Sequence, residues 1–199
     1  MADGDKASGG TAVSAGVADS ARTIVYPGTF DPLTLGHLDL VERASGIFDR
    51  VILAVAAASS KPGAMFSLQE RLDMARETVS SLPNVSVEAL PGMLVDFCHV
   101  HGARVVLRGL RAYSDFEAEF QMALTNRKLA PDIETFFLMP KEEHSCVSSS
   151  TVREIASYAG DTTSFVPPAV QRYIERRVVL TRLAGGGAAP RSSGLEVAP

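Results

Sequence analysis

The 199-residue sequence has little basic charge, little cysteine and no long apolar run. Its formal net charge is −4, so the protein as a whole gives no sign of binding nucleic acid or an anionic membrane, although local basic residues can still form an anion site. Cys98 and Cys146 have neither metal-ligand spacing nor a disulfide framework, which predicts reduced thiols and a cytoplasmic location. No apolar run reaches the ~18 residues that a membrane span requires.

Both ends of the sequence lack residues that could build a core. Residues 1–21 are small, polar and slightly acidic, without the basic and apolar regions of a signal peptide. The other end is rich in Gly, Pro and Ser. We therefore expect a disordered extension at 1–21, one folded domain over 22–183 and a disordered tail over 184–199.

Short runs of β-branched and aromatic residues alternate with helical patterns along the domain. This alternation predicts an α/β, Rossmann-like fold, with a parallel five-stranded sheet, helices on both faces and further helices at the C-terminal end. The strands are expected at 23–26, 51–56, 85–90, 104–107 and 134–139. The helical patterns begin near Leu38, Leu68, Leu94 and Phe116, and two more lie within 148–160 and 167–180.

Three details refine the helices. Ser67 and Glu70 have the spacing of a capping box at the start of the second helix. Gly102 is placed to end the third helix as its C′ residue. In the fourth helix, an apolar face is expected from Phe116 to Leu124.

Polar stretches follow four of the predicted strands, at 27–37, 56–66, 108–117 and 144–150. In an open parallel sheet the ligand lies beyond the carboxyl ends of the strands, at a point where the strand order reverses. We therefore expect these stretches to meet at one edge of the sheet and to form the functional site.

The first stretch, Tyr26-Pro-Gly-Thr-Phe-Asp-Pro-Leu-Thr-Leu-Gly-His37, joins a strand to a helix. Gly28 and Gly36 would let the backbone and a ligand approach closely, and unpaired N–H groups at the helix start favour an anion. His37 would add a neutral donor or a cation; alternatively, it is a structural hydrogen bonder. Neither G-x-G-x-x-G nor G-x-x-x-x-G-K-[ST] is present, so neither dinucleotide binding nor a P-loop is indicated.

Four motifs together resemble a known family. GTFDP at 28–32 followed by TLGH at 34–37 resembles the signature of the nucleotidyltransferase superfamily. With RGLR at 108–111, DFE and a further Glu at 115–119, and VSSSTVRE at 147–154, the chain is similar to the bacterial phosphopantetheine adenylyltransferases. The likeness spans nearly the whole predicted domain.

The resemblance implies transfer of an adenylyl group from ATP to 4′-phosphopantetheine, with Mg²⁺ carried by the phosphates and a homohexameric assembly. Related cytidylyltransferases and nicotinamide mononucleotide adenylyltransferases usually carry histidine where this chain has Thr34, and they lack the RGLR stretch. Two rival functions are another nucleotidyltransferase of the superfamily and a nucleotide-binding domain without turnover.

The resemblance also assigns roles to particular residues. His37 would stabilise the transition state. The residues assigned to ATP are Thr29, Phe30, His37, Gly109, Leu110, Arg111, Glu119, His144, Ser145, Cys146, Val147, Ser148, Ser149 and Ser150. The residues assigned to phosphopantetheine are Thr29, Lys61, Leu94 and Arg108.

Simpler roles stay open for several of these residues. Lys61 could be a solvated loop charge, and Leu94 a core residue. Arg108 and Arg111 could form salt bridges with Asp115 or Glu117, or recognise phosphate through bidentate contacts. The three serines at 148–150 could cap the following helix, or form an anion cradle with its N–H groups. Relatives often carry aromatic residues at the positions of His144 and Cys146.

Overall fold

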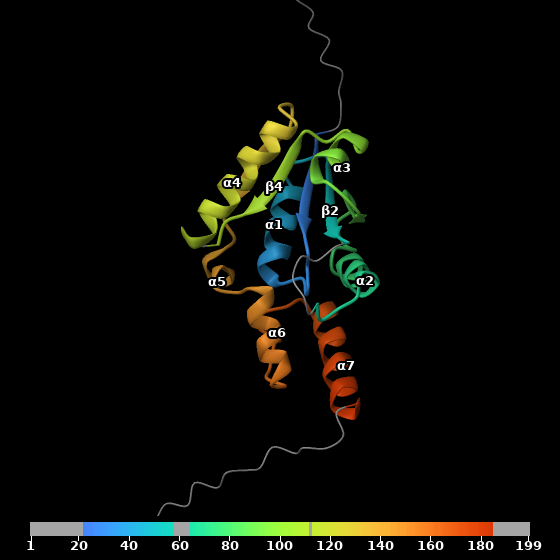
Figure 1. Ribbon diagram of the computed structural model, residues 1–199. Helices are drawn as coiled ribbons and strands as arrows, with labels where there is room; N and C mark the ends of the chain where they lie inside the picture. The colour runs from blue at the N-terminus through green and yellow to red at the C-terminus, as the bar shows by residue number, and fades with distance from the viewer. Residues whose placement is uncertain (1–21, 58–63, 112, 185–199) are drawn as a thin grey trace, which may run out of the picture.

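The computed structural model describes residues 22–57, 64–111 and 113–184 (Figure 1). Five parallel strands form one sheet in the order β3-β2-β1-β4-β5, so the predicted fold class is confirmed. The strands are β1 (Thr23–Gly28), β2 (Arg50–Ala56), β3 (Val85–Leu90), β4 (Val105–Gly109) and β5 (Glu134–Leu138). The helices are α1 (Leu35–Ser45), α2 (Leu68–Thr78), α3 (Leu94–Val100), α4 (Tyr113–Leu129), α5 (Glu142–Ser145), α6 (Ser149–Ser157) and α7 (Pro168–Ala184).

The sheet separates two apolar cores. Neighbouring residues of β2 show this directly, because Leu53 packs with α1 and α2 while Ile52 packs with α3 on the other face. The central strands β1 and β2 are buried along almost their whole length, whereas the edge strands β3 and β5 are largely half-buried. The near-continuous apolar runs of the central strands therefore reflect helices on both faces.

Most predicted boundaries agree with the structure. Ser67 and Glu70 form the predicted capping box, and Gly102 follows α3 with a left-handed φ of 63°. The differences lie near the polar loops. β1 and β4 continue to Gly28 and Gly109, and the short helix α5 was not predicted. Ala184, predicted to begin the tail, ends α7; residues 1–21 and 185–199 lie outside the described residues.

The predicted core-facing side of α4 is wrong. Phe116, Phe120 and Leu124 are each about half exposed, and the two phenylalanine rings stack on one another with centroids 5.6 Å apart. Among residues 116–129 of this helix, whose burial the structure describes, Asn126 is the buried one. α4 carries apolar residues on most of its surface, so the side-chain period alone did not distinguish the side that faces the sheet.

The strand order reverses between β1 and β4, which are parallel neighbours in the sheet although two strands separate them in the sequence. In Figure 1 the strands point downward, and α6 and α7 lie beyond their carboxyl ends. Both cysteines are free, Cys98 buried and Cys146 exposed. In the part of the chain that the structure describes, no helix is long and apolar enough to cross a membrane.

Candidate active site

A cleft of about 760 Å³ opens at the carboxyl edge of the sheet, where β1 and β4 meet. Its volume is typical of small-molecule sites. The loop after β1, the starts of α3 and α6, the end of β4 and one side of α4 form its walls. The predicted site residues that line it are Thr29, Phe30, His37, Leu94, Arg108, Gly109, Arg111, Glu119, Val147, Ser148, Ser149 and Ser150.

Four other predicted site residues, Leu110, His144, Ser145 and Cys146, do not line this cleft. Leu110 follows β4, and its N–H donates to the carbonyl of Leu138. His144, Ser145 and Cys146 belong to α5 and its C-cap, directly before Val147, which does line the cleft. Lys61 lies outside the described residues, so its predicted position beside the cleft stays a prediction.

The loop between β1 and α1 folds back on itself. Phe30 has a left-handed φ of 47°, and its ring lies over Gly28, where an added β-carbon would come within 2.6 Å of the ring. Gly28 therefore makes room for Phe30; because Gly28 also lines the cleft, its expected role beside a ligand stays a prediction. Phe30 is buried and meets His37 edge-on, with ring centroids 5.2 Å apart, so its side chain is a core residue beneath the cleft.

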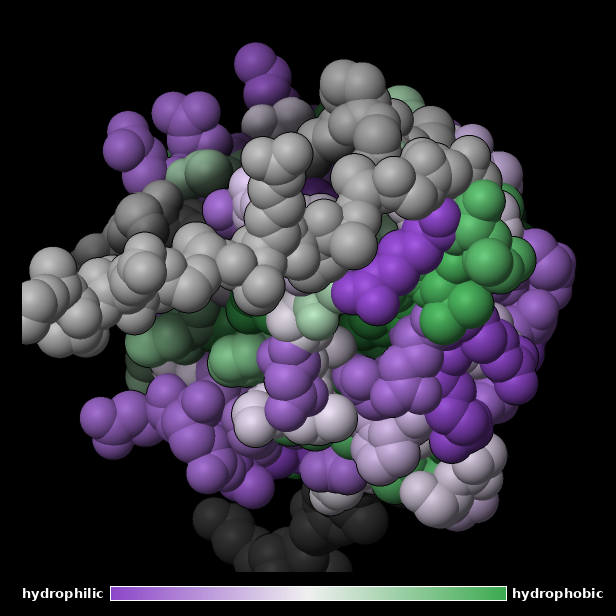
Figure 2. All heavy atoms as spheres, turned by 90° about the horizontal axis from the view of Figure 1, so that it is seen from below, coloured by the Kyte–Doolittle hydropathy of each residue, from purple (hydrophilic) through white to green (hydrophobic). Residues whose placement is uncertain are grey.

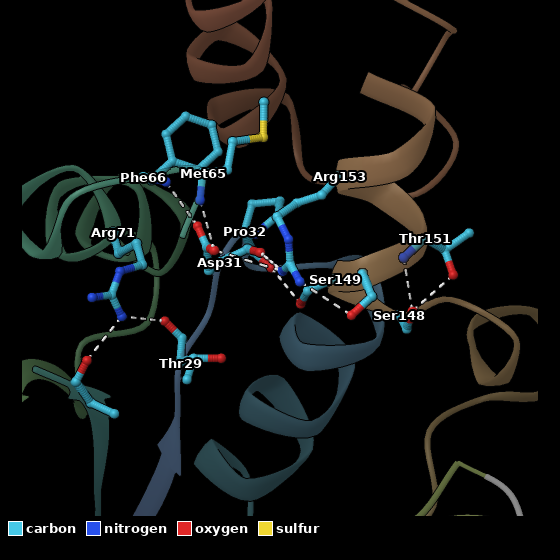
Figure 3. Close-up of polar contacts among 12 residues, drawn as sticks. Thr29, Asp31, Pro32, Met65, Phe66, Arg71, Ser148, Ser149, Thr151 and Arg153 are labelled. Carbon is cyan, nitrogen blue, oxygen red and sulfur yellow. Dashed lines mark hydrogen bonds and ion pairs between the residues drawn. The ribbon is translucent and has the colours of Figure 1, made fainter. Parts of the chain in front are cut away.

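Two arginines hold this loop from opposite sides (Figure 3). Arg71 of α2 donates to the carbonyls of Thr29, at 2.7 Å, and Ala56, at 2.9 Å. Arg153 of α6 donates to the carbonyl of Asp31 at 2.5 Å. The Asp31 carboxylate accepts N–H groups of Met65 and Phe66, at 3.0 and 2.9 Å. The loop backbone is thus fixed before any ligand binds.

The three serines of the predicted anion cradle are all engaged with protein groups. Ser148 caps α6 by accepting the N–H of Thr151, which confirms the predicted cap. Ser149 donates to the carbonyl of Pro32 at 2.9 Å, and Ser150 accepts from Arg153 at 3.2 Å. Of these hydroxyls, that of Ser149 joins α6 directly to the loop after β1, as Figure 3 shows. A ligand in the cleft would meet them as part of a connected network.

His37 is the third residue of α1 and takes part in its capping. Its Nδ1 lies 3.0 Å from the backbone nitrogen of Thr34, and its own N–H donates to Thr34 Oγ1. Because Nδ1 accepts a backbone N–H, the proton of the neutral ring belongs on Nε2. The structural role weighed from the sequence is therefore confirmed for Nδ1. The role of His37 as a donor to a ligand stays a prediction, which its place in the cleft wall allows.

The charge of His37 follows from its surroundings. Burial, together with the positive charge of Arg111, lowers the pKa of His37 from 6.5 to about 4. The ring is therefore neutral at pH 7, which selects the neutral donor from the two states considered. Arg111 lies close by; one of its guanidinium nitrogens is 3.5 Å from the Val147 carbonyl.

The first turn of α1 offers less to an anion than the sequence suggested. The N–H of Leu35 donates to the carbonyl of Phe165, and that of His37 is used by the cap, so two of the groups left unpaired at a helix start are occupied. An added β-carbon on Gly36 would lie 3.3 Å from the carbonyl oxygen of His144. Gly36 therefore lets α5 pack against α1. At the start of α1, these two N–H groups are therefore not available to an anion.

Arg108 and Glu119 form the most closely paired charges of the cleft. Arg108 Nε lies 2.5 Å from Glu119 Oε2, and Nη2 lies 2.7 Å from Oε1. Arg108 Nη1 also reaches the carbonyl of Pro27 at 3.3 Å. The salt-bridge alternative was thus correct in kind, but the partner is Glu119. Leu94 has both of its expected positions, because it lines the cleft and packs against the second core.

Sequence reasoning gave no role to three residues that shape the site. Arg153 stands in the matched VSSSTVRE motif, and its spacing of three from Ser150 puts both on one helix face, which was a usable signal. Asp31 likewise stands in the matched GTFDP motif at 28–32. Arg71 had no signal, because an arginine in an amphipathic helix normally faces solvent, whereas Arg71 is 3% exposed.

We expect His37 to remain neutral until the pH falls to about 4. The unfolded chain takes up this proton near pH 6.5, so His37 makes the fold less stable as the pH falls between these values. An NMR titration of the imidazole ¹³C and ¹⁵N resonances measures this, with His37→Asn identifying the signal. A midpoint near 6.5, or a proton on Nδ1, would contradict the described geometry.

Comparison with known proteins identifies the family of the folded part of the chain. Residues 25–155 match the family model described as cytidylyltransferase-like. The chain is 55% identical over 165 residues to a phosphopantetheine adenylyltransferase of Methylococcus capsulatus, covering 83% of this chain and 98% of the relative. It is 56% identical over 160 residues to that of Alkalilimnicola ehrlichii, covering 79% and 91%.

A solved structure extends the likeness to the fold. The crystal structure of a candidate nicotinate-nucleotide adenylyltransferase from Vibrio parahaemolyticus superposes with a TM-score of 0.60, at 16% identity, and covers 78% of this chain and 99% of that one. At this identity the match concerns the fold alone. On the sequence relatives and the family model, the chain belongs to the cytidylyltransferase-like family and, within it, to the phosphopantetheine adenylyltransferases.

Proposed function

We propose that this protein transfers the adenylyl group of ATP to 4′-phosphopantetheine, giving dephospho-coenzyme A and pyrophosphate, a step of coenzyme A biosynthesis. One observation carries the proposal: residues of all four motifs that mark the family line a single cleft. Its named relatives match over most of their own length, so the whole domain is shared.

The reaction needs positioning more than acid–base chemistry. A phosphate oxygen of the acceptor attacks the α-phosphorus of ATP, and the bond to the bridging oxygen of the β-phosphate breaks as pyrophosphate leaves. The acceptor phosphate is already anionic at pH 7, so no strong base is required. Arg108, together with Lys61, would hold it against the loop at Thr29. Such alignment of both reactants is itself a large catalytic effect.

His37 would act on the triphosphate. Its Nε2 proton is presented by a ring that the cap of α1 fixes in orientation. A neutral donor adds no positive charge beside the phosphates. Its hydrogen bond can still stabilise the negative charge that moves across the α-phosphorus in the transition state. Arg111 would supply the positive charge on the same side of the cleft.

We infer that Mg²⁺ enters with the nucleotide. Among the described residues, no three His, Cys, Asp or Glu side chains are grouped to hold a metal. The cleft carboxylates are engaged, Asp31 by two backbone N–H groups and Glu119 by Arg108. This donor set fits an ion that phosphate oxygens coordinate and that neutralises their charge. Asp31 and Glu119 would keep their structural contacts.

We expect pyrophosphate to be released when the protein is given ATP, Mg²⁺ and 4′-phosphopantetheine. Matched reactions with CTP, with nicotinamide mononucleotide or with glycerol phosphate separate the rival transferases, and chromatography identifies the product. Release with a different nucleotide or acceptor would replace the proposed substrate pair. Nucleotide binding without turnover of any pair would indicate a binding domain.

We expect His37→Asn to lower kcat by about 10²–10³-fold, the usual loss for one preorganised donor. The asparagine amide oxygen takes the place of Nδ1 in the cap, but nothing replaces the Nε2 proton. His37→Gln, which carries an amide nitrogen near the Nε2 position, should retain more turnover. ATP binding, followed by calorimetry, should change little in His37→Asn. Normal turnover of a folded His37→Asn protein would reduce this residue to its capping role.

We propose that the chain assembles with itself, as a homohexamer. The support is the apolar side chains that α4 and β5 expose, which include Phe116, Phe120, Leu124 and Phe136. At the lower end of the molecule α7 also exposes apolar residues, and the view from below shows an apolar patch beside charged side chains (Figure 2). The free thiols agree with a cytoplasmic location.

We expect sedimentation velocity to give a mass of six chains. Phe120→Glu should dissociate the assembly, because a charge would be buried at a contact between copies. Glu117→Lys, on an exposed part of the same helix, is the matched control. A monomer at every concentration would contradict the assembly without affecting the proposed reaction.

A further inference from the structure

The contact between Arg108 and Glu119 has a definite geometry. The carboxylate takes the side edge of the guanidinium, formed by Nε and Nη2, through two contacts at 2.5 and 2.7 Å. The carbonyl of Pro27 accepts a hydrogen bond from Nη1 at 3.3 Å. The two side chains are 25% and 21% exposed, so the pair sits in the cleft wall and not on the open surface.

A guanidinium carries five N–H groups in a fixed plane. Glu119 and Pro27 use three of them, one on each nitrogen. One N–H on Nη1 and one on Nη2 remain, and the one on Nη2 belongs to the terminal edge of the guanidinium, between Nη1 and Nη2. This edge has the spacing of two phosphate oxygens and allows a bidentate contact.

We propose that Glu119 is a positioning residue for the acceptor phosphate: it orients Arg108 so that the terminal edge of its guanidinium meets the phosphate. The inference rests on the proposed function, in which Arg108 binds 4′-phosphopantetheine. It adds to Glu119 a role toward the acceptor, separate from any contact that its remaining lone pairs make with ATP.

Two opposing effects of Glu119 decide the outcome. Its negative charge repels the phosphate, whereas its two hydrogen bonds restrict an arginine side chain that otherwise has many rotamers. Phosphate binding would restrict those rotamers and lose side-chain entropy. Because Glu119 already restricts them in the free protein, less entropy is lost when phosphate binds. The pair is also short and bidentate, which is the geometry in which such contacts are strongest. The orienting effect is therefore expected to exceed the repulsion.

The test is binding of 4′-phosphopantetheine without nucleotide, so that contacts with ATP do not contribute. Calorimetry on Glu119→Ala should show affinity weaker by about tenfold or more, the size of a lost hydrogen bond to a charged group. If Glu119→Ala does not fold, the same measurement is made on Glu119→Gln, which keeps the side-chain shape. Glu117→Ala removes the same charge from an exposed position two residues earlier on α4 and should bind like the wild type.

Two further measurements separate positioning from general disruption. Pantetheine, which lacks the phosphate, should inhibit the wild type and Glu119→Ala equally in competition with the acceptor. In an Arg108→Ala background, adding Glu119→Ala should change acceptor affinity little, because the residue to be positioned is absent.

Unchanged or tighter acceptor binding by the Glu119 variants would overturn the inference; tighter binding would mean that Glu119 competes with phosphate for Arg108. A full effect of Glu119→Ala in the Arg108→Ala background, or on pantetheine, would overturn it as well. These results differ from failure of the proposed function, which would appear as wild-type protein that neither binds 4′-phosphopantetheine nor releases pyrophosphate with it.

Discussion

The fixed backbone of the loop between β1 and α1 underlies everything else in the site. Arg71 of α2 and Arg153 of α6 each donate to a backbone carbonyl of this loop. The loop is therefore joined to one helix on either side. Arg71 is almost fully buried, and among the described residues no carboxylate pairs with it; two carbonyl oxygens stabilise its charge. Burying a charge in this way is costly, so the loop conformation depends on the surrounding fold.

A loop held this firmly changes how the cleft recognises phosphate. The carbonyls of Thr29, Asp31 and Pro32 are paired with protein donors, and part of the first turn of α1 is occupied too. Two N–H groups of the helix start, which serves as the anion site in many nucleotide-binding folds, are thus unavailable to an anion. In the proposed reaction Arg108 and Arg111 would supply positive charge, and His37 would donate one hydrogen bond. Such preorganised donors need little rearrangement when charge develops.

The charges of the cleft are arranged by burial and pairing. His37 is kept neutral by its low pKa, and Glu119 partly neutralises Arg108 while fixing its plane. A cleft lined only by free cations would attract phosphates but would not orient them. Pairing with Glu119 lowers the net positive charge of the cleft but fixes the direction of the Arg108 N–H donors. An in-line displacement requires such fixed directions.

The sequence by itself determined the layers of the fold and the group of segments that form the site. The apolar runs identified β1 and β2 as buried strands. Ser67 marked the start of α2 and Gly102 the end of α3, because both depend on local backbone conformation alone. The convergence of the four polar stretches followed from the parallel sheet. Tertiary structure alone decided what each side chain does there. Phe30 fills the space over Gly28, His144 fills that beside Gly36, and α4 turns Asn126 inward and Phe120 outward. Glu119 pairs with Arg108 from eleven residues away. Local sequence rules describe a residue's own backbone and its near neighbours, whereas these contacts join segments whose distance is set only when the sheet and its helices have packed.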